Sequence, residues 1–307
     1  MSSLPSLSPR LRQGSGRMER IDRLGWRSAT CFDSHGLRVG LRCNQPGLLE
    51  RLEPHLPPGW KAAASPVVDQ VFSLWVGRSH PTRGGRHIHL YAGPSRRLRT
   101  SSLDEALALL ESEIRQGVAA GSCRRTFVHA GVVGWAGRAI LVPGRSRSGK
   151  TTLVAELVRA GATYYSDEFA PLDGRGRVHP FPKLLSVRGE AGCDVHVRPT
   201  RPEELGGVVG REPLPVGLVV LASYRPGADW RPVPVGPGQA VLEMLAHTVP
   251  ARLRPAASLR ALARAVAGAR VLKGERGEAP ETAAKLLEAV EERVRSSRRR
   301  AGQRGMR

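Results

Sequence analysis

The stretch that most constrains the fold is residues 144–151, which read GRSRSGKT. Gly144, Gly149, Lys150 and Thr151 satisfy the pattern G-x-x-x-x-G-K-[ST], whose glycines let the backbone curl ahead of a helix. The apolar run AILV precedes this loop as a strand, and an amphipathic helix follows it. Four apolar side chains share one face of that helix: Leu153, Val154, Leu157 and Val158. The sequence therefore predicts a strand, a glycine-rich loop and a helix in direct succession.

A loop of this pattern is typical of nucleotide phosphate sites. Backbone N–H groups and the positive end of the helix dipole hold phosphate oxygens, while Lys150 reaches the terminal phosphates and Thr151 ligates Mg²⁺. A glycine- and serine-rich turn without a ligand is the alternative, and the loop alone does not separate an ATPase, a GTPase and a kinase. The expected nucleotide-binding residues are Gly144, Arg145, Ser146, Arg147, Ser148, Gly149, Lys150, Thr151 and Thr152.

An acidic pair, Asp167 and Glu168, begins seventeen residues after Lys150 in the segment YYSDEFA. Neighbouring residues on a strand point to opposite faces, so both acids reach one site only where the strand ends or twists. One carboxylate beside the phosphates can hold Mg²⁺, and another can accept a proton from an attacking hydroxyl. An acidic turn after a strand is the alternative interpretation.

Three histidines are candidates for chemistry. His129 lies fifteen residues before Gly144 in the predicted strand TFVHAGVVGW, where a structural role is the alternative. His87 and His89 alternate on one strand face, as a metal pair does, but no third ligand is near in the sequence. We therefore favour a non-metal role for His87 and His89.

The net charge of +21 raises the question of nucleic-acid binding. Only five of the 48 basic residues are lysines, and the arginines are spread along the whole chain. Aromatic residues make up 5% of the sequence, which leaves few platforms for base stacking. We therefore expect no nucleic-acid partner, and we expect the basic residues 296–307 to be a disordered tail.

The spacing of the cysteines and the length of the apolar runs indicate the cellular compartment. The four cysteines show no CxxC spacing, and no apolar run reaches the 18 residues of a membrane span. The first 20 residues contain no apolar core of a secretion signal, and Met18 is an alternative start to Met1. We expect a cytoplasmic protein with reduced thiols and no membrane contact.

Alternating strand and helix patterns predict an α/β fold. We expect a disordered lead over residues 1–20, a small α+β region over 21–122 and an α/β phosphate-loop domain over 123–295. Within the second region, Ser102 and Glu105 have the spacing of a capping box at the start of a helix. After the buried strand PVGLVVLASY, the rest of the chain is predicted to be helical.

In its order of motifs, the chain resembles the catalytic domain of bacterial HPr kinase/phosphorylase. The shared elements are His129, the glycine loop, the pair beginning at Asp167 and the segment PKLLSVRG, which ends in Arg188 and Gly189. The likeness covers about residues 125–245. Taken whole, the chain is most similar to the uncharacterised HPr-kinase-related proteins, which carry a different N-terminal region.

The resemblance implies a PEP-carboxykinase-like P-loop fold and Mg-ATP-dependent phosphorylation of a serine on a small protein or peptide. It implies that Asp167 is the general base, that Glu168 and Thr151 serve the metal, that His129 lines the site and that Arg188 stabilises the transferred charge. The oligomeric state stays open, with a homo-oligomer among the alternatives.

The chain departs from the family pattern at three places. Ser186 stands where the family has an acid two residues before the arginine, EAGCDVHVRP replaces a glycine-rich continuation, and Arg147 replaces a small loop residue. These differences bear on reverse phosphorolysis and on HPr as the substrate. Two rival hypotheses remain, a non-catalytic nucleotide switch or ATPase that acts through a partner, and a nucleic-acid-binding ATPase.

Overall fold

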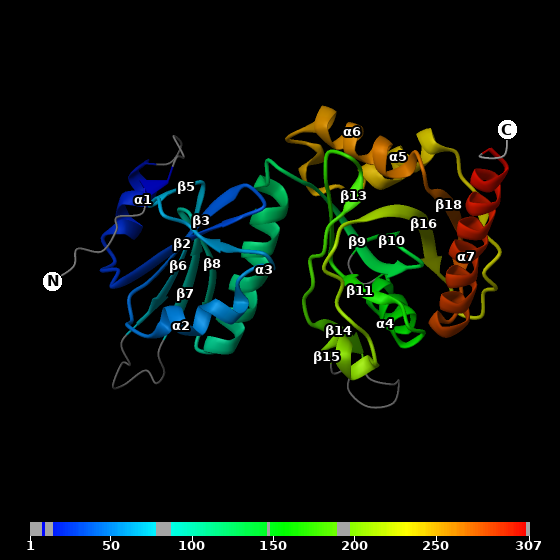
Figure 1. The fold of residues 1–307 in the computed structure, drawn as a ribbon. Helices are drawn as coiled ribbons and strands as arrows, with labels where there is room; N and C mark the ends of the chain where they lie inside the picture. Colours follow the sequence, from blue (N-terminus) through cyan, green and yellow to red (C-terminus); the bar gives the residue numbers. More distant parts are fainter. Residues whose placement is uncertain (1–7, 10–14, 78–86, 146–147, 189–196, 305–307) are drawn as a thin grey trace. The chain divides into compact units, whose positions relative to one another are not determined.

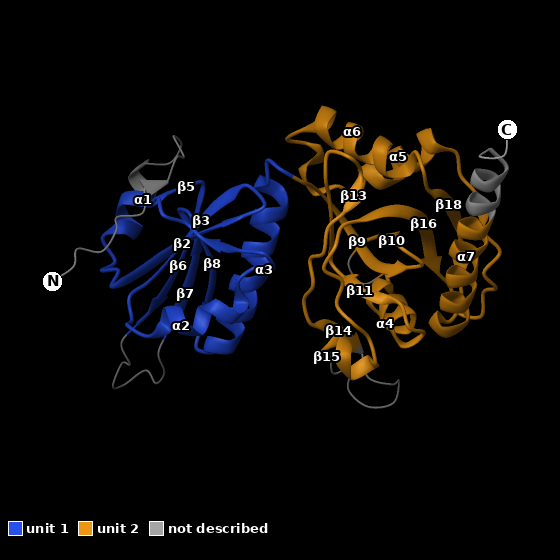
Figure 2. Cartoon of the chain, viewed as in Figure 1, with its two compact units in different colours: residues 1–124 blue, residues 125–307 orange. Residues whose placement is uncertain are grey.

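The computed structural model describes residues 8–9, 15–77, 87–145, 148–188 and 197–304 (Figure 1). The chain is a mixed α/β protein with several sheets. It divides into two compact units, residues 1–124 and 125–307 (Figure 2). Among the described residues, no helix is both long and apolar enough to cross a membrane.

The first unit is built on a six-stranded sheet in the order β4-β2-β3-β6-β7-β8. Helix α3 packs against β6, β7 and β8 with its apolar stripe, which includes the buried Leu110 and Ile114. The predicted start of this helix is confirmed, since the Ser102 hydroxyl accepts a hydrogen bond from the backbone N–H of Glu105 at 3.2 Å. The elements are β1 (Ser8–Pro9), α1 (Ser15–Asp22), β2 (Ser28–Ser34), β3 (Leu37–Cys43), α2 (Leu48–Leu52), η1 (Glu53–His55), β4 (Lys61–Ala62), β5 (Val67–Val68), β6 (Gln70–Val76), β7 (Ile88–Ala92), β8 (Ser95–Thr100) and α3 (Leu103–Gly121).

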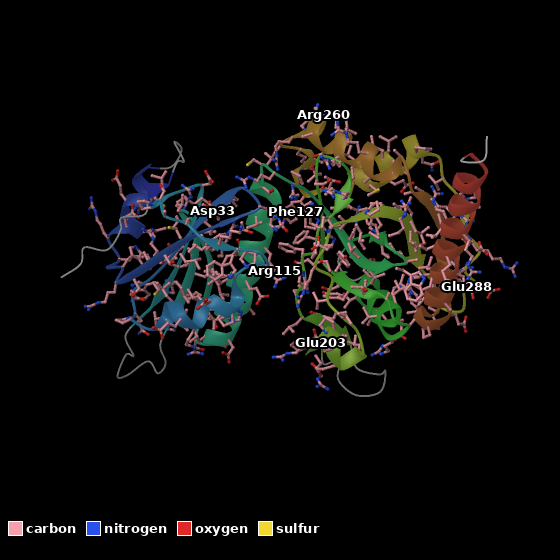
Figure 3. The ribbon with its side chains drawn as sticks, viewed as in Figure 1. Asp33, Arg115, Phe127, Glu203, Arg260 and Glu288 are labelled. Atoms are coloured by element: carbon pink, nitrogen blue, oxygen red, sulfur yellow. The ribbon has the colours of Figure 1, made fainter. Side chains whose placement is uncertain are left out.

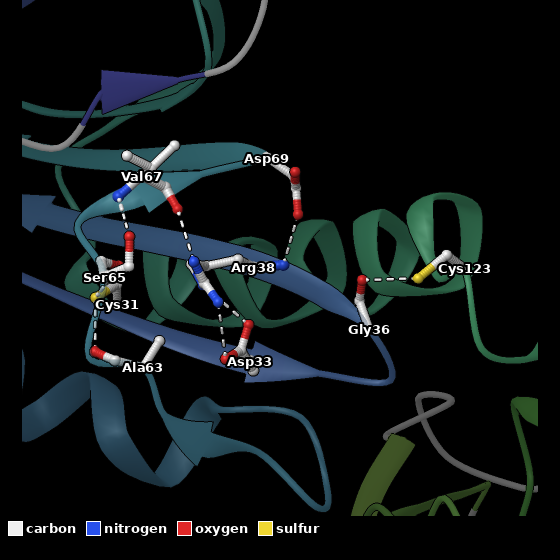
Figure 4. A network of polar contacts seen from close by, with 9 residues as sticks. All are labelled: Cys31, Asp33, Gly36, Arg38, Ala63, Ser65, Val67, Asp69 and Cys123. Carbon is white, nitrogen blue, oxygen red and sulfur yellow. Dashed lines mark hydrogen bonds and ion pairs between the residues drawn. The ribbon is translucent and has the colours of Figure 1, made fainter.

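A polar network ties the β2–β3 hairpin to the rest of this unit (Figure 4). The Arg38 guanidinium pairs with Asp33 at 3.1 Å, and its backbone N–H donates to Asp69 at 2.9 Å. The Cys123 thiol contacts the carbonyl of Gly36, a turn residue with a φ of 86°. These contacts line a pocket of about 500 Å³.

The second unit holds an eight-stranded sheet in which β10, β16 and β18 run parallel side by side. Its elements are β9 (Thr126–Trp135), β10 (Arg138–Pro143), α4 (Lys150–Arg159), β11 (Thr163–Ser166), β12 (Phe169–Leu172), β13 (Arg177–Val178), β14 (Leu185–Arg188), β15 (Val197–Thr200), η2 (Pro202–Leu205), β16 (Leu214–Tyr224), β17 (Val233–Pro234), α5 (Pro237–Leu245), η3 (Val249–Ala251), α6 (Pro255–Val266), β18 (Arg270–Arg276) and α7 (Ala279–Arg304).

Two apolar cores cover the two faces of this sheet. Because side chains alternate along a strand, Ile140 packs with helices α4 and α7 while the next residue, Leu141, packs with α5 and α6. Phe127, which Figure 3 labels, lies edge-on to Phe169 and Phe181 in a fully buried aromatic cluster. The predicted strand and helix are confirmed as β10 and α4, with residues 144–145 and 148–149 of the loop described between them.

At three places near the chain's ends the described residues differ from the expectation. Residues 8–9 pair with β5 and residues 15–22 form α1, held by the buried Ile21, so the lead is ordered at these positions. Residues 296–304 are helical, since α7 continues through Gly302 to Arg304. Residues 270–276 form the strand β18 instead of helix, since pairing with β16 overrides a weak local pattern.

Deletion of residues 296–307 is expected to leave the unfolding temperature nearly unchanged. Among the α7 side chains that the structure describes, which end at Arg295, those in the core are Ala279, Ala283, Leu286, Leu287, Val290 and the half-buried Val294. Differential scanning calorimetry of the truncated and full chains measures the effect. A fall of many degrees would show that the last turns of α7 carry stability.

Candidate functional site

The glycine-rich loop connects the parallel strand β10 to the N-terminus of α4. Gly149 caps the helix with a φ of 79°, a left-handed conformation that favours glycine. A Cβ atom on Gly144 would lie 2.8 Å from the Ser148 hydroxyl, which would have to turn away to make room. Of the two glycines of the motif, Gly149 therefore has the stronger conformational reason to be glycine. Ser146 and Arg147 lie outside the described residues.

Lys150 is a buried cation at the first position of α4, with 6% of its surface exposed. Its Nζ donates to the carbonyl of Arg145 and lies 3.5 Å from the Ser148 hydroxyl. Burial lowers the pKa of Lys150 to about 8, while the nearby charges of Asp167 and Glu168 act in the opposite direction. Lys150 is therefore a buried ammonium group surrounded by residues of the loop, an arrangement suited to bind an anion.

Asp167 and Glu168 lie where the chain passes from β11 to β12. Both strands pair with β9, whose register with β11 shifts between Tyr164 and Ser166, and residues 167–168 form a bend that belongs to neither strand. The Glu168 carbonyl accepts the Ala130 N–H at 3.1 Å, and the half-buried Glu168 side chain raises the pKa of Lys150. The break meets the condition under which both acids can serve one site.

The Asp167 carboxylate, on a residue that is 5% exposed, is held by three side chains. The Thr151 hydroxyl donates to Oδ2 at 3.1 Å, and the Tyr164 hydroxyl shares its one proton between Oδ1 at 3.2 Å and the Lys183 carbonyl oxygen at 2.9 Å. Lys183 Nζ lies 3.3 Å from Oδ1. The aspartate is therefore fixed beside the first turn of α4.

Thr151 and Asp167 fit the requirements of a Mg²⁺ ion held jointly with phosphates. Mg²⁺ prefers hard oxygen ligands and is usually bound by one or two carboxylates together with phosphate oxygens and water. A hydroxyl and a carboxylate oxygen 3.1 Å apart at the start of α4 supply two such ligands. Among the described residues, no three His, Cys, Asp or Glu side chains cluster as an all-protein metal site.

His129 of β9 forms a hydrogen bond to the first residue of the loop through its side chain. Its Nδ1 lies 2.7 Å from the carbonyl oxygen of Gly144, and since a carbonyl only accepts, Nδ1 carries the proton. Burial lowers the pKa of His129, and the charge of Lys150 lowers it further. Phe169 packs edge-on against the ring with centroids 5.7 Å apart. His129 is thus placed to fix the position of Gly144.

Acidification is expected to destabilise the fold through His129. Burial, and then the charges of Lys150 and His247, lower its pKa, whereas the hydrogen bond to the Gly144 carbonyl and the charge of Asp167 raise it; the net effect is a lowered pKa. The unfolded chain therefore takes up the proton first, so stability is complete above about pH 6.5 and falls as the pH drops toward the folded-state pKa. His129→Asn keeps a donor for Gly144 and should reduce the loss of unfolding free energy between pH 7 and 5. His87→Asn, at an exposed position, is the control; equal pH dependence in both variants would contradict the assignment.

A large pocket adjoins the loop at the carboxyl ends of β10, β16 and β18. This edge of a parallel sheet is where α/β proteins commonly bind ligands. The pocket has a volume of about 1260 Å³. It is lined by Pro143, Gly144, Arg145, Ser148, Gly149, Thr152, Leu221, Ala222, Ser223, Tyr224, Glu243, His247, Lys273, Gly274, Glu275, Arg276, Glu278, Ala279 and Pro280. The loop thus borders the pocket, whereas Lys150, Thr151, Asp167 and His129 are not among its lining residues.

Arg188, a predicted site residue, is the last residue of β14, which forms a two-stranded sheet with β15. Leu185 of the same strand packs into the core shared with α4. The Arg188 side chain lies outside the described part of the chain, so its direction is not assigned.

Sequence reasoning missed several residues that the fold brings to the site. Lys183 and Tyr164 contact Asp167, and His247 and Arg276 line the pocket. Lys183 is one of only five lysines, which is the one signal that could have drawn attention to it. No local sequence pattern predicts that Arg276 reaches the site, because its position depends on the pairing of β18 with β16.

No known protein family matches the chain, and no curated protein matches it either. Among solved structures, the chain is similar to the Hpr(Ser) kinase/phosphatase from Coxiella burnetii, with 14% sequence identity and a TM-score of 0.34. The match covers 59% of this chain and 97% of that chain. A TM-score this low does not establish a shared fold, so the site rests on the residues described above.

Proposed function

We propose that the chain is a Mg-ATP-dependent kinase, with a PEP-carboxykinase-like P-loop domain, that phosphorylates a serine hydroxyl of a small protein or peptide. The observation that carries the proposal is the pairing of Thr151 with Asp167 at 3.1 Å, next to the buried Lys150. A hydroxyl, a carboxylate and a lysine at the start of a helix are the groups that P-loop enzymes use on Mg-nucleotides. A cytoplasmic location belongs to the same proposal.

In the proposed reaction, the serine oxygen forms a bond to the γ-phosphorus while the bond from that phosphorus to the β–γ bridging oxygen breaks, releasing ADP. The hydroxyl proton passes to a carboxylate, for which Asp167 is the candidate. Lys150 stabilises charge on the phosphates, and Arg188 does so on the transferred group. Thr151, with Glu168 or Asp167, would hold Mg²⁺, which supplies further charge neutralisation when bound.

One observation favours the rival function of a non-catalytic nucleotide switch. Both Asp167 oxygens are already engaged, by Thr151 on one side and by Tyr164 and Lys183 on the other. A switch needs an ordered nucleotide site but no base with access to an acceptor hydroxyl. In that case ATP would order an interface with a partner protein.

Phosphoryl transfer to peptides separates the two functions. The full chain is incubated with Mg-ATP and a serine-containing peptide library, and products are read by mass spectrometry alongside ADP release. Serine-to-alanine versions of each hit are the matched controls. Phosphopeptide formation that disappears with the serine supports the kinase. Tight ATP binding without any phosphopeptide supports the switch.

A further inference from the structure

Arg276 links the end of β18 to the glycine-rich loop, 127 residues away in sequence. Its Nη2 donates to the Gly149 carbonyl at 2.9 Å, and its Nη1 donates to the Gly277 carbonyl at 3.0 Å. The guanidinium carbon lies 5.2 Å from the centre of the Tyr224 ring. A Cβ atom on Gly149 would lie 2.4 Å from Nη2, so a side chain at position 149 would displace the guanidinium group.

The charge of Arg276 is buried without an ion-pair partner in the described part of the chain. The residue is 4% exposed, and its hydrogen bonds go to neutral carbonyl oxygens. The nearby Glu278 instead accepts a hydrogen bond from Tyr224 at 2.9 Å. A buried cation without a contacting anion is costly, and an anion entering the site offsets that cost. Arg276 lines the pocket beside the loop, where such an anion would bind.

We propose that Arg276 is a second cation of the phosphate site, which fixes the loop through the Gly149 carbonyl and stabilises the polyphosphate of a bound nucleotide. This inference rests on one part of the proposed function, the binding of a nucleotide at this site. The Gly149 carbonyl also accepts the Leu153 N–H at 3.1 Å, the first hydrogen bond of α4. Through it, Arg276 holds the helix N-terminus from which phosphates are bound.

The test compares ATP, inorganic triphosphate and adenosine as probes of the full-length protein. Arg276→Met keeps the aliphatic stem and removes the charge and donors, and Arg276→Lys keeps the charge alone. Arg225→Met is the matched control, because Arg225 is exposed at the end of the neighbouring strand and pairs with Glu275 at 3.1 Å. Affinities are measured by calorimetry or by competition, and circular dichroism checks that each variant is folded.

For Arg276→Met, we expect ATP and triphosphate to bind about 10- to 100-fold more weakly, the loss typical of a charged hydrogen-bonding group. Arg276→Met should bind adenosine with the parental affinity, and Arg225→Met should bind all three probes with the parental affinity. The ATP affinity of Arg276→Lys should lie between those of the parent and Arg276→Met. Parental ATP affinity in Arg276→Met, or an equal loss for adenosine, would overturn the inference. If the parent protein binds ATP but transfers no phosphate, the kinase proposal fails and the inference about Arg276 stands. A parent that binds neither ATP nor triphosphate would remove both.

Discussion

The Lys150→Met variant is expected to bind ATP at least about 100-fold more weakly than the parent. Lys150 supplies the loop's ammonium group, and a lost hydrogen-bonded charge costs roughly this much or more. The fold should survive, because methionine fills the same volume and no desolvated charge remains to be buried. Burial already lowers the pKa of this lysine to about 8, so its environment disfavours the charged form. Calorimetric titration with Mg-ATP measures the loss.

Lys285→Met is the matched control for this prediction. Lys285 is an exposed lysine of α7, so the same substitution there changes the net charge without touching the loop. Its ATP affinity should equal that of the parent. If Lys150→Met also binds ATP at the parental affinity, residues 144–151 are not the phosphate site.

For Asp167→Asn, we expect the rate of phosphoryl transfer to fall by about 10²- to 10⁴-fold, the usual contribution of a general base. Asparagine keeps the size and can still contact Thr151 and Tyr164, so ATP affinity should fall much less. The paired measurement is nucleotide affinity beside the initial rate of phosphopeptide formation. Glu168→Gln separates the two acids, since it should raise the Mg²⁺ concentration needed for half-maximal rate.

Other outcomes would change the assignment. Parental transfer rates in Asp167→Asn would exclude Asp167 as the base. A large loss of ATP affinity in the same variant would mean that Asp167 serves mainly the metal with Thr151, as their 3.1 Å contact also allows. The Lys183→Met variant removes the ion pair at 3.3 Å and tests whether that contact is needed for phosphoryl transfer.

Local sequence signals predicted the parts of the fold that depend on local physics. The glycine loop followed by α4, the Ser102 cap of α3 and the strand at residues 126–135 are all present. Each depends on nearby residues: a turn that needs glycine, a hydroxyl that caps a helix, or an apolar run bounded by a turn. The predicted roles of the site residues stay predictions until the variants are measured.

Features that depend on distant pairing could not be predicted. The β18 segment RVLKGER has a mixed burial pattern, and only the parallel pairing with β16 makes it a strand. Arg276 and Lys183 reach the site through this kind of long-range arrangement, as their contacts with Gly149 and Asp167 show. Spacing along the chain carried no information about either contact.

The central claim is that residues 144–151 hold the phosphates of a nucleotide with a divalent ion at Thr151. The most direct test is calorimetric titration of the full chain with ATP, once with Mg²⁺ and once with the metal chelated. We expect saturable one-to-one binding with Mg²⁺ that weakens about tenfold or more on chelation, since Mg²⁺ bridges the phosphates to the protein. Absence of binding at millimolar Mg-ATP would contradict the account.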